Sequence, residues 1–275
     1  RVMKKLRLRL VAAGILAAVA ALAPGLRGAA AAELTLMVEP SYPPDQAAEV
    51  YKPLVDYLAA TTKHQIKLVT PRNYHFFWRD LRQNTAVDLV FAEAHFTDFR
   101  IKRFNAEPLV RTAEKTSYTL LASDQLENPT LATLFGRSIV TMPSPSLGFA
   151  LLIELFPNPM SQPNILSTAA SWRDGVEIVF GGEGDAAIVP TWLKEQYPNL
   201  VPIQTSREFP GAAITASAGL DGSIRSDITA ALLTLHENAD MYSVLAEIGV
   251  TRFEPATAAE YEGAEKMLKE FYGYD

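Results

Sequence analysis

The stretch "LTLMVEPSYPPDQAAEVYKPLVDYLAAT", residues 34–61, decides the fold. Its first seven residues are typical of an apolar strand, and the pattern predicts a helix over 44–61. Apolar side chains recur there every three or four residues, on a face that holds Ala47, Val50, Tyr51, Leu54, Val55 and Leu58. A strand followed so closely by an amphipathic helix is typical of a parallel sheet covered by helices.

The same alternation continues along the chain in two series. In the first, the patterns predict strands at 65–70, 87–94 and 117–124 and helices at 74–83 and 96–104. In the second, they predict strands at 138–143 and 185–191 and helices near 129–135 and at 147–156 and 172–182. Two further extended stretches, 201–205 and 212–218, are followed by helices only, at 223–239, 241–249 and 258–273.

Two successive α/β series predict an α/β protein with two lobes, each built on a mainly parallel sheet flanked by helices, and a ligand cleft between them. We expect lobe one to contain 33–120 plus 210–275 and lobe two to contain 121–209. The chain then crosses between the lobes twice.

The first 32 residues are typical of a secretory signal peptide. Basic residues between 4 and 9 precede the short apolar run 10–23, and small residues follow around Ala30 and Ala32. The apolar run is shorter than a membrane-spanning helix needs. We therefore expect a protein secreted to the periplasm, without stable membrane insertion.

The amino-acid composition limits which classes of molecule the protein can bind. The chain has no cysteine, which excludes disulfides and thiolate metal sites. Six of its 25 basic residues and none of its 31 acidic residues precede Glu33, so the chain from Glu33 carries a net charge of −12. Such a surface repels nucleic acid. We expect a monomer that binds a small molecule, binds no nucleic acid and needs no cofactor.

Polar and aromatic side chains follow several of the expected strands. Ligands of open α/β sheets bind at these carboxyl ends, so the candidates for one shared cleft are Tyr42, Tyr74, Glu93, His95, Ser144, Ser146, Trp172 and Trp192. Most of the aromatic ones could equally be core. Glu93 and His95 could form a metal pair or a general base, but no third ligand is evident and we predict neither a metal site nor catalytic residues.

The helix start in "VTMPSPSLGFALLIELF", residues 140–156, has two interpretations. Ser146 can simply cap the helix by accepting one of its unpaired amide hydrogens. Alternatively, the exposed amides and the helix dipole can hold an anion there.

The chain resembles the phosphate/phosphite/phosphonate-type periplasmic solute-binding proteins of ABC transporters, which have the type II periplasmic-binding fold. The matching segments are "SYPPDQAAEVYKPLVDYL", "LVTPRNY", "VDLVFAEAHF", "GRSIVTMPSPSLGF", "SWRDGVEIVFGGEGDAAIVP" and "ITAALLTL". The resemblance implies that a small oxyanion is held at the helix start formed by Ser144, Ser146 and Leu147, and that Tyr74 contributes to the pocket.

The same resemblance shows departures that bear on the ligand. Where the family often has a histidine and an acidic residue, this chain has Trp172 and, nearby, Trp192. A tyrosine at the end of the third strand is replaced around Ala92. These changes argue against an aminoalkylphosphonate, and favour a drier, aromatic-walled pocket or a small oxyanion.

We therefore expect a solute-binding protein that closes around its ligand and delivers it to an ABC permease. Three alternatives stay open. The same fold could serve a membrane histidine kinase as its sensor subunit, or bind a metal or an aromatic or other organic solute. It could also be an enzyme that uses His95 and Glu93.

Overall fold

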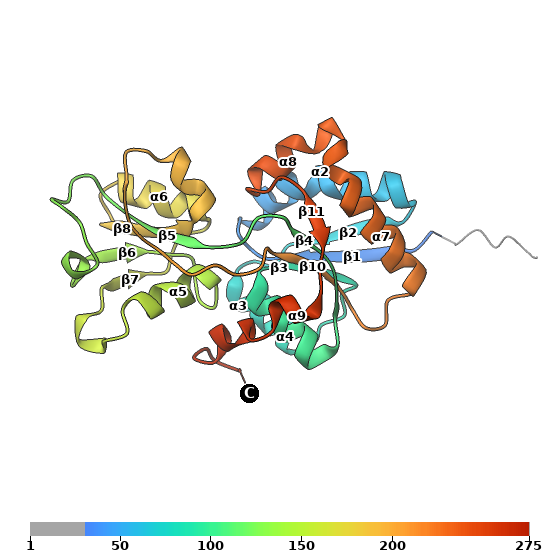
Figure 1. The fold of residues 1–275 in the computed structure, drawn as a ribbon, viewed down its shortest axis with the longest axis horizontal. Coiled ribbons are helices and arrows are strands. Elements are labelled where there is room, and N and C mark those ends of the chain that lie inside the picture. The colour runs from blue at the N-terminus through green and yellow to red at the C-terminus, as the bar shows by residue number, and fades with distance from the viewer. Residues whose placement is uncertain (1–30, 275) are drawn as a thin grey trace, which may run out of the picture. The chain divides into compact units, whose positions relative to one another are not determined.

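The computed structural model describes residues 31–274, which fold into two mixed sheets with helices on both faces of each (Figure 1). Residues 33–275 form one compact unit. The expected signal peptide lies, except for its last two residues, outside the described residues. In the part that is described, no helix is long and apolar enough to span a membrane.

The first sheet has six strands in the order β11-β4-β10-β3-β1-β2. Strand β1 is parallel to its neighbours β2 and β3, whereas β10 is antiparallel to β3 and β4, and β11 is antiparallel to β4. The strand bounds are β1 (Glu33–Val38), β2 (Gln65–Val69), β3 (Leu89–Ala92), β4 (Glu107–Thr112), β10 (Ala213–Ala216) and β11 (Phe253–Pro255).

Helices cover both faces of this sheet, with α2, α7 and α8 on one side and α3, α4 and α9 on the other (Figure 1). Their bounds are α2 (Pro44–Thr62), α3 (Tyr74–Arg82), α4 (Ala94–Phe104), α7 (Gly222–Thr234), α8 (Tyr242–Glu247) and α9 (Ala258–Tyr261). Of the face expected for α2, Ala47, Tyr51, Leu54 and Leu58 are buried. The rings of Phe77 and Trp78 pack on Phe96 and Phe99 of α4, so most of the aromatic run at 74–78 is core.

The second sheet has five strands in the order β7-β6-β8-β5-β9, with α6 and α5 on opposite faces (Figure 1). Strand β6 is parallel to β7 and β8, and β5 is antiparallel to β8 and β9. The bounds are β5 (Tyr118–Ala122), β6 (Ser138–Val140), β7 (Asn164–Leu166), β8 (Ala186–Pro190), β9 (Val201–Thr205), α5 (Leu147–Leu155) and α6 (Trp172–Phe180).

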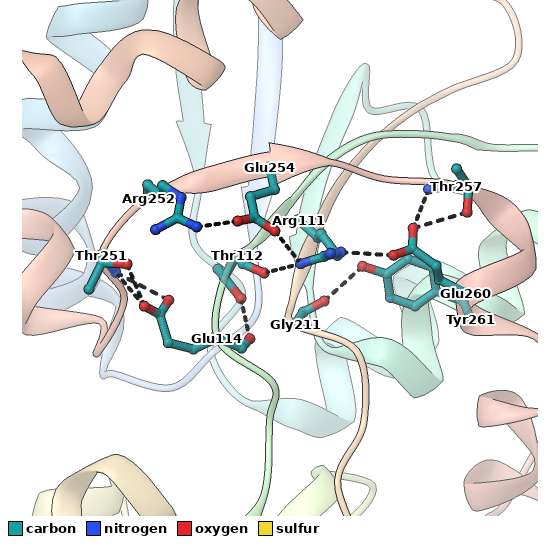
Figure 2. Close-up of polar contacts among 10 residues, drawn as sticks. All are labelled: Arg111, Thr112, Glu114, Gly211, Thr251, Arg252, Glu254, Thr257, Glu260 and Tyr261. Atoms are coloured by element: carbon teal, nitrogen blue, oxygen red, sulfur yellow. Dashed lines mark hydrogen bonds and ion pairs between the residues drawn. The ribbon is translucent and has the colours of Figure 1, made fainter.

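The two segments that join the sheets run side by side. Thr116 and Phe209 form an antiparallel bridge, and the amide of Thr112 donates to the carbonyl of Ala212 at 2.9 Å. Figure 2 shows the polar contacts around this crossing. There Arg111 pairs with Glu254 at 3.1 Å and with Glu260 at 3.0 Å. The crossing is thereby tied to the C-terminal part of the chain.

The α/β architecture agrees with the sequence prediction, but several details differ. The sheets are mixed rather than mainly parallel. Each time the chain crosses to the other sheet, it enters with a strand that is antiparallel to its neighbours; these strands are β5 and β10. The predicted helix near 129–135 is a short 3-10 turn at Ala132–Leu134. Strands β4, β7 and β11 were not predicted, and β11 shows that the last part of the chain is not helical only. The lobe boundaries stay a prediction.

Candidate functional site

A cavity of about 310 Å³ lies at the carboxyl ends of β1, β3 and β8. Small-molecule sites typically enclose roughly 300–1,000 Å³, so this one suits a small solute. Strand ends of both sheets contribute to its lining, as do the segment from Thr112 to Tyr118 and the turn after α8 at Ile248–Val250. Among the predicted residues, those in the lining are Tyr42, Glu93, Trp172 and Trp192.

Tyr42 is held in place by Glu247, the last residue of α8. Its hydroxyl donates to the carbonyl oxygen and to the carboxylate of Glu247, at 3.1 and 3.2 Å. Its ring meets the ring of Tyr51 edge to face. Burial and the nearby Glu247 raise the pKa of Tyr42, so this phenol stays neutral and acts as a donor.

The two tryptophans come from the second sheet. Trp172 is the first residue of α6, after the capping residue Ser171, and its ring meets that of Tyr118 edge to face with centroids 5.0 Å apart. Trp192 belongs to the 3-10 helix Thr191–Gln196 and carries the Arg173 guanidinium 5.5 Å from its ring centre. Trp172 and Trp192, the two tryptophans expected at the pocket, therefore both line the cavity.

The other five predicted residues lie outside the lining. Tyr74 is buried beneath it, with its ring stacked on Phe96. The imidazole Nε2 of His95 bonds to the carbonyl of Pro145 at 3.0 Å, and burial lowers the pKa of His95 to about 3, so the ring is neutral. The remaining three, at the start of α5, are Ser144, Ser146 and Leu147.

Ser146 is the N-cap of α5. Its buried hydroxyl accepts from the amide of Phe149 at 3.3 Å. The helix start is also covered, because Gly148 leaves room there for the ring of Trp172: a Cβ at Gly148 would lie 2.6 Å from that ring and 2.9 Å from the ring of Tyr118. The capping interpretation is confirmed, whereas ligand binding at this helix start stays a prediction.

We expect Ser146→Ala to lower the free energy of unfolding by about 1 kcal/mol, the usual cost of losing a helix cap. Chemical denaturation of the chain from Glu33 measures it. Ser144→Ala is the matched control, since Ser144 is half-buried and does not cap α5. An equal loss in both variants would mean that the capping bond does not stabilise the helix.

The structure adds two functional candidates that the sequence interpretation missed, Glu39 and Tyr118. The amide of Glu93 donates to Glu39 Oε2 at 2.7 Å, and the Tyr118 hydroxyl donates to Glu93 Oε1 at 2.7 Å. Burial raises the pKa of Glu39 to about 7 and that of Glu93 well above its ordinary value, and the proximity of the two carboxyls raises the latter further. The signal for Glu39 was available, because this acid directly follows the apolar strand "LTLMV".

Hydroxyl groups line the cavity on the side of the second sheet. The Ser117 hydroxyl donates to Thr191 Oγ1 at 2.9 Å, and Thr119 lies 2.9 Å from the hydroxyls of both Thr191 and Thr205. Ser117 and Thr191 both line the cavity. This chain of hydroxyls can orient to donate to a bound oxyanion.

Glu93 and His95 do not act together in the structure, since Glu93 bonds to Tyr118 and His95 to Pro145. Within the described residues, no group of three or more His, Cys, Asp or Glu side chains is arranged to hold a metal ion.

Comparison with known proteins decides the family. Residues 36–261 match the family model described as an ABC transporter, phosphonate, periplasmic substrate-binding protein. The chain belongs to this family. Its members are periplasmic substrate-binding proteins, which identifies a small-molecule ligand and a transporter as the partners of the family. No match to the sequence was found among curated proteins.

Several solved structures share the fold of this family member. One is PhnD1 of Prochlorococcus marinus in complex with methylphosphonate, at a TM-score of 0.73 and 16% identity over 86% of this chain and 96% of that one. A binding protein component of an ABC phosphonate transporter from Pseudomonas aeruginosa has a TM-score of 0.70 and 15% identity, over 84% and 83% of the two chains. A Xanthomonas citri protein bound to ATP has a TM-score of 0.65 and 15% identity, over 86% and 96%.

Proposed function

We propose that this protein captures a small solute of the phosphate/phosphonate class in the cavity between its two sheets and delivers it to an ABC permease. The proposal rests on the observation that residues from both sheets line the cavity. Tyr42 and Glu93 follow strands of the first sheet. Thr191 and Trp192 follow a strand of the second sheet. A ligand in contact with both sheets stabilises the arrangement in which they enclose it, and a membrane partner can recognise that arrangement.

In this proposal the hydroxyls of Ser117 and Thr191 bind the oxyanion, and the rings of Trp172 and Trp192 exclude water around it. These donors are uncharged, and the chain from Glu33 has a net charge of −12, whose field opposes an anion. The binding energy must then come from local hydrogen bonds rather than from long-range attraction.

Binding of methylphosphonate should raise the melting temperature of the chain from Glu33 by roughly 5–10 °C when the ligand is present at about 100 times its Kd. It should also change the tryptophan fluorescence, because Trp172 and Trp192 line the cavity. The protein is first unfolded and refolded to remove any bound solute.

The double variant Trp172→Phe/Trp192→Phe should remove most of the fluorescence change, whereas Trp78→Phe should preserve it. Trp78 serves as the control because it is buried in α3 with its indole bonded to the carbonyl of Tyr272. If phosphate, phosphite and methylphosphonate all leave the melting temperature unchanged, the proposed ligand class is wrong. A permease and an ATPase encoded beside this chain would support the transport partner, and a histidine kinase there would oppose it.

A further inference from the structure

The turn that ends α8 touches a tryptophan of the second sheet at the cavity. Gly249 in this turn and Trp192 in the 3-10 helix after β8 both line the cavity. A Cβ at Gly249 would lie 2.2 Å from Cδ2 of the indole, 2.4 Å from Cε2 and 2.6 Å from Cγ. Real side chains do not approach a neighbour so closely, so the indole rests directly against the glycine backbone. Any larger residue at position 249 would have to displace it.

The end of a helix does not by itself explain the glycine. Gly249 follows the last turn of α8 with a left-handed backbone, at φ +72°. Helices often end in this way, and glycine is the usual residue there. The same chain, however, ends α2 and α4 with Lys63 and Asn105 in that conformation, at φ +64° and +53°. Left-handed helix ends in this protein thus accept side chains, and it is the space occupied by Trp192 that demands glycine at 249.

A second contact orients the Trp192 indole. The Arg173 guanidinium of α6 lies 5.5 Å from its ring centre and also pairs with the Glu247 carboxylate of α8 at 3.7 Å. Both partners of this ion pair are partly exposed, so it orients the indole more than it stabilises the fold. Because Cγ of a tryptophan is one bond from Cβ, the ring can leave Gly249 only by rotation about χ1 or by separation of the two backbones. Either motion breaks the contact across the cavity.

We propose that Gly249 is the seat on which Trp192 closes the cavity, and that this contact sets how tightly a ligand is held. The inference rests on the proposed function in taking the cavity as the ligand site. Gly249 acts through Trp192 as a positioning residue and supplies no group to the ligand. The contact joins elements of both sheets, so it is made only when the two sides of the cavity are together. The apparent affinity for a ligand falls with the fraction of the protein in that arrangement.

Gly249→Ala should weaken the binding of methylphosphonate about tenfold or more, because the added methyl group keeps the indole off its seat. Isothermal titration calorimetry measures the loss. Gly182→Ala is the matched control. Gly182 follows α6 at φ +78°, and its amide donates to the Val179 carbonyl at 3.0 Å, as the Gly249 amide donates to that of Ala246 at 3.1 Å. A Cβ at Gly182 meets no atom within 4 Å, so the control carries the backbone strain without the contact.

A second substitution distinguishes the seat from a strained helix end. In a Trp192→Ala chain there is no indole to displace, so adding Gly249→Ala should cost no more affinity than Gly182→Ala does. Strain confined to the helix end would instead give the same loss with and without the indole. The free energy of unfolding, measured by urea denaturation, provides the same comparison in the absence of ligand.

The contact also has a spectroscopic signature that needs no ligand. The chain has three tryptophans, so the double variant Trp78→Phe/Trp172→Phe leaves Trp192 as the only one. In that background Gly249→Ala should make the fluorescence of Trp192 easier to quench with acrylamide, because the displaced ring is more exposed to water. Gly182→Ala should leave the quenching unchanged, since its methyl group meets no neighbour.

The outcomes separate this inference from the proposed function. If methylphosphonate binds Gly249→Ala as tightly as Gly182→Ala, or if Gly249→Ala costs the same affinity in the Trp192→Ala chain, the seat is refuted and the phosphonate function stands. If phosphate, phosphite and methylphosphonate all fail to bind the unchanged protein, the proposed function is refuted and the quenching decides the seat. Greater quenching in Gly249→Ala alone then supports the seat, and equal quenching in both glycine variants overturns it. Thermal unfolding of each variant confirms that it is folded.

Discussion

Replacing Glu39 by glutamine should raise the free energy of unfolding at pH 8 relative to the unchanged protein. The gain at pH 8 should exceed the gain at pH 4 by about 3 kcal/mol. Burial raises the pKa of Glu39 from 4.5 to about 7 in the folded state. Between these two values the folded chain retains a proton that the unfolded chain has lost. The free energy of unfolding of the unchanged protein therefore falls as the pH rises from about 4.5 to about 7, and it does not fall further on account of Glu39 above that range.

The Glu39→Gln substitution keeps an oxygen that can accept from the Glu93 amide and removes the group that ionises. Urea denaturation of the unchanged protein and of this variant at several pH values between about 4 and 8 measures the difference. Glu208→Gln, at an exposed position, should follow the unchanged protein at every pH. Parallel curves for Glu39→Gln and the unchanged protein would show that Glu39 ionises as freely in the folded chain as in the unfolded one.

Gly211→Val should lower the free energy of unfolding by about 3 kcal/mol, the upper part of the usual range for overpacking. Gly211 lies where the chain crosses back from the second sheet, beside Thr112 and Glu114 (Figure 2). A Cβ there would contact the backbone carbonyl and hydroxyl of Thr112 and lie 2.5 Å from the carbonyl of Glu114. Backbone atoms cannot turn away as a side chain can, so the two crossing segments would have to separate.

The same separation would disturb the hydrogen bond from Tyr261 to the Gly211 carbonyl, 2.8 Å long in the structure. Chemical denaturation measures the loss, and Gly219→Ala is the control, because a Cβ at Gly219 meets no atom within 4 Å. If Gly211→Val is as stable as Gly219→Ala, close packing of the crossing segments does not contribute to stability.

Sequence periodicity predicted the long elements of the fold well. Helix α2 begins at Pro44 as expected and ends one residue beyond its expected end, because its buried face repeats over most of its length. Strands β7 and β11 have only three residues each, too few for a periodic signal. The antiparallel pairing of β10 with β3 and β4 depends on contacts between residues more than a hundred positions apart, which the local pattern of "AAITASA" does not contain.

The sequence predicted the candidate site only in part. The strand-end residues of the cavity could be predicted, whereas the covering of the start of α5 could not. Ligand groups at strand ends are a property of the fold class, so Glu93 and Trp192 could be expected at the cavity from their positions alone. Whether a helix start is open is a property of the packing. Gly148 admits the ring of Trp172 against the first turn of α5, and that contact joins residues 24 positions apart in the sequence. Only the structure shows that the start of α5 is covered.

Strand β10 sets the order in which the two sheets can be completed when the chain reaches its compartment N-terminus first. It lies between β3 and β4 in the first sheet, although every strand of the second sheet separates it from β4 in the sequence. A chain that has emerged only as far as Thr205 has every strand of the second sheet, but in the first sheet β3 and β4 still lack the strand that joins them. The sheet that the N-terminus begins is thus the last to close.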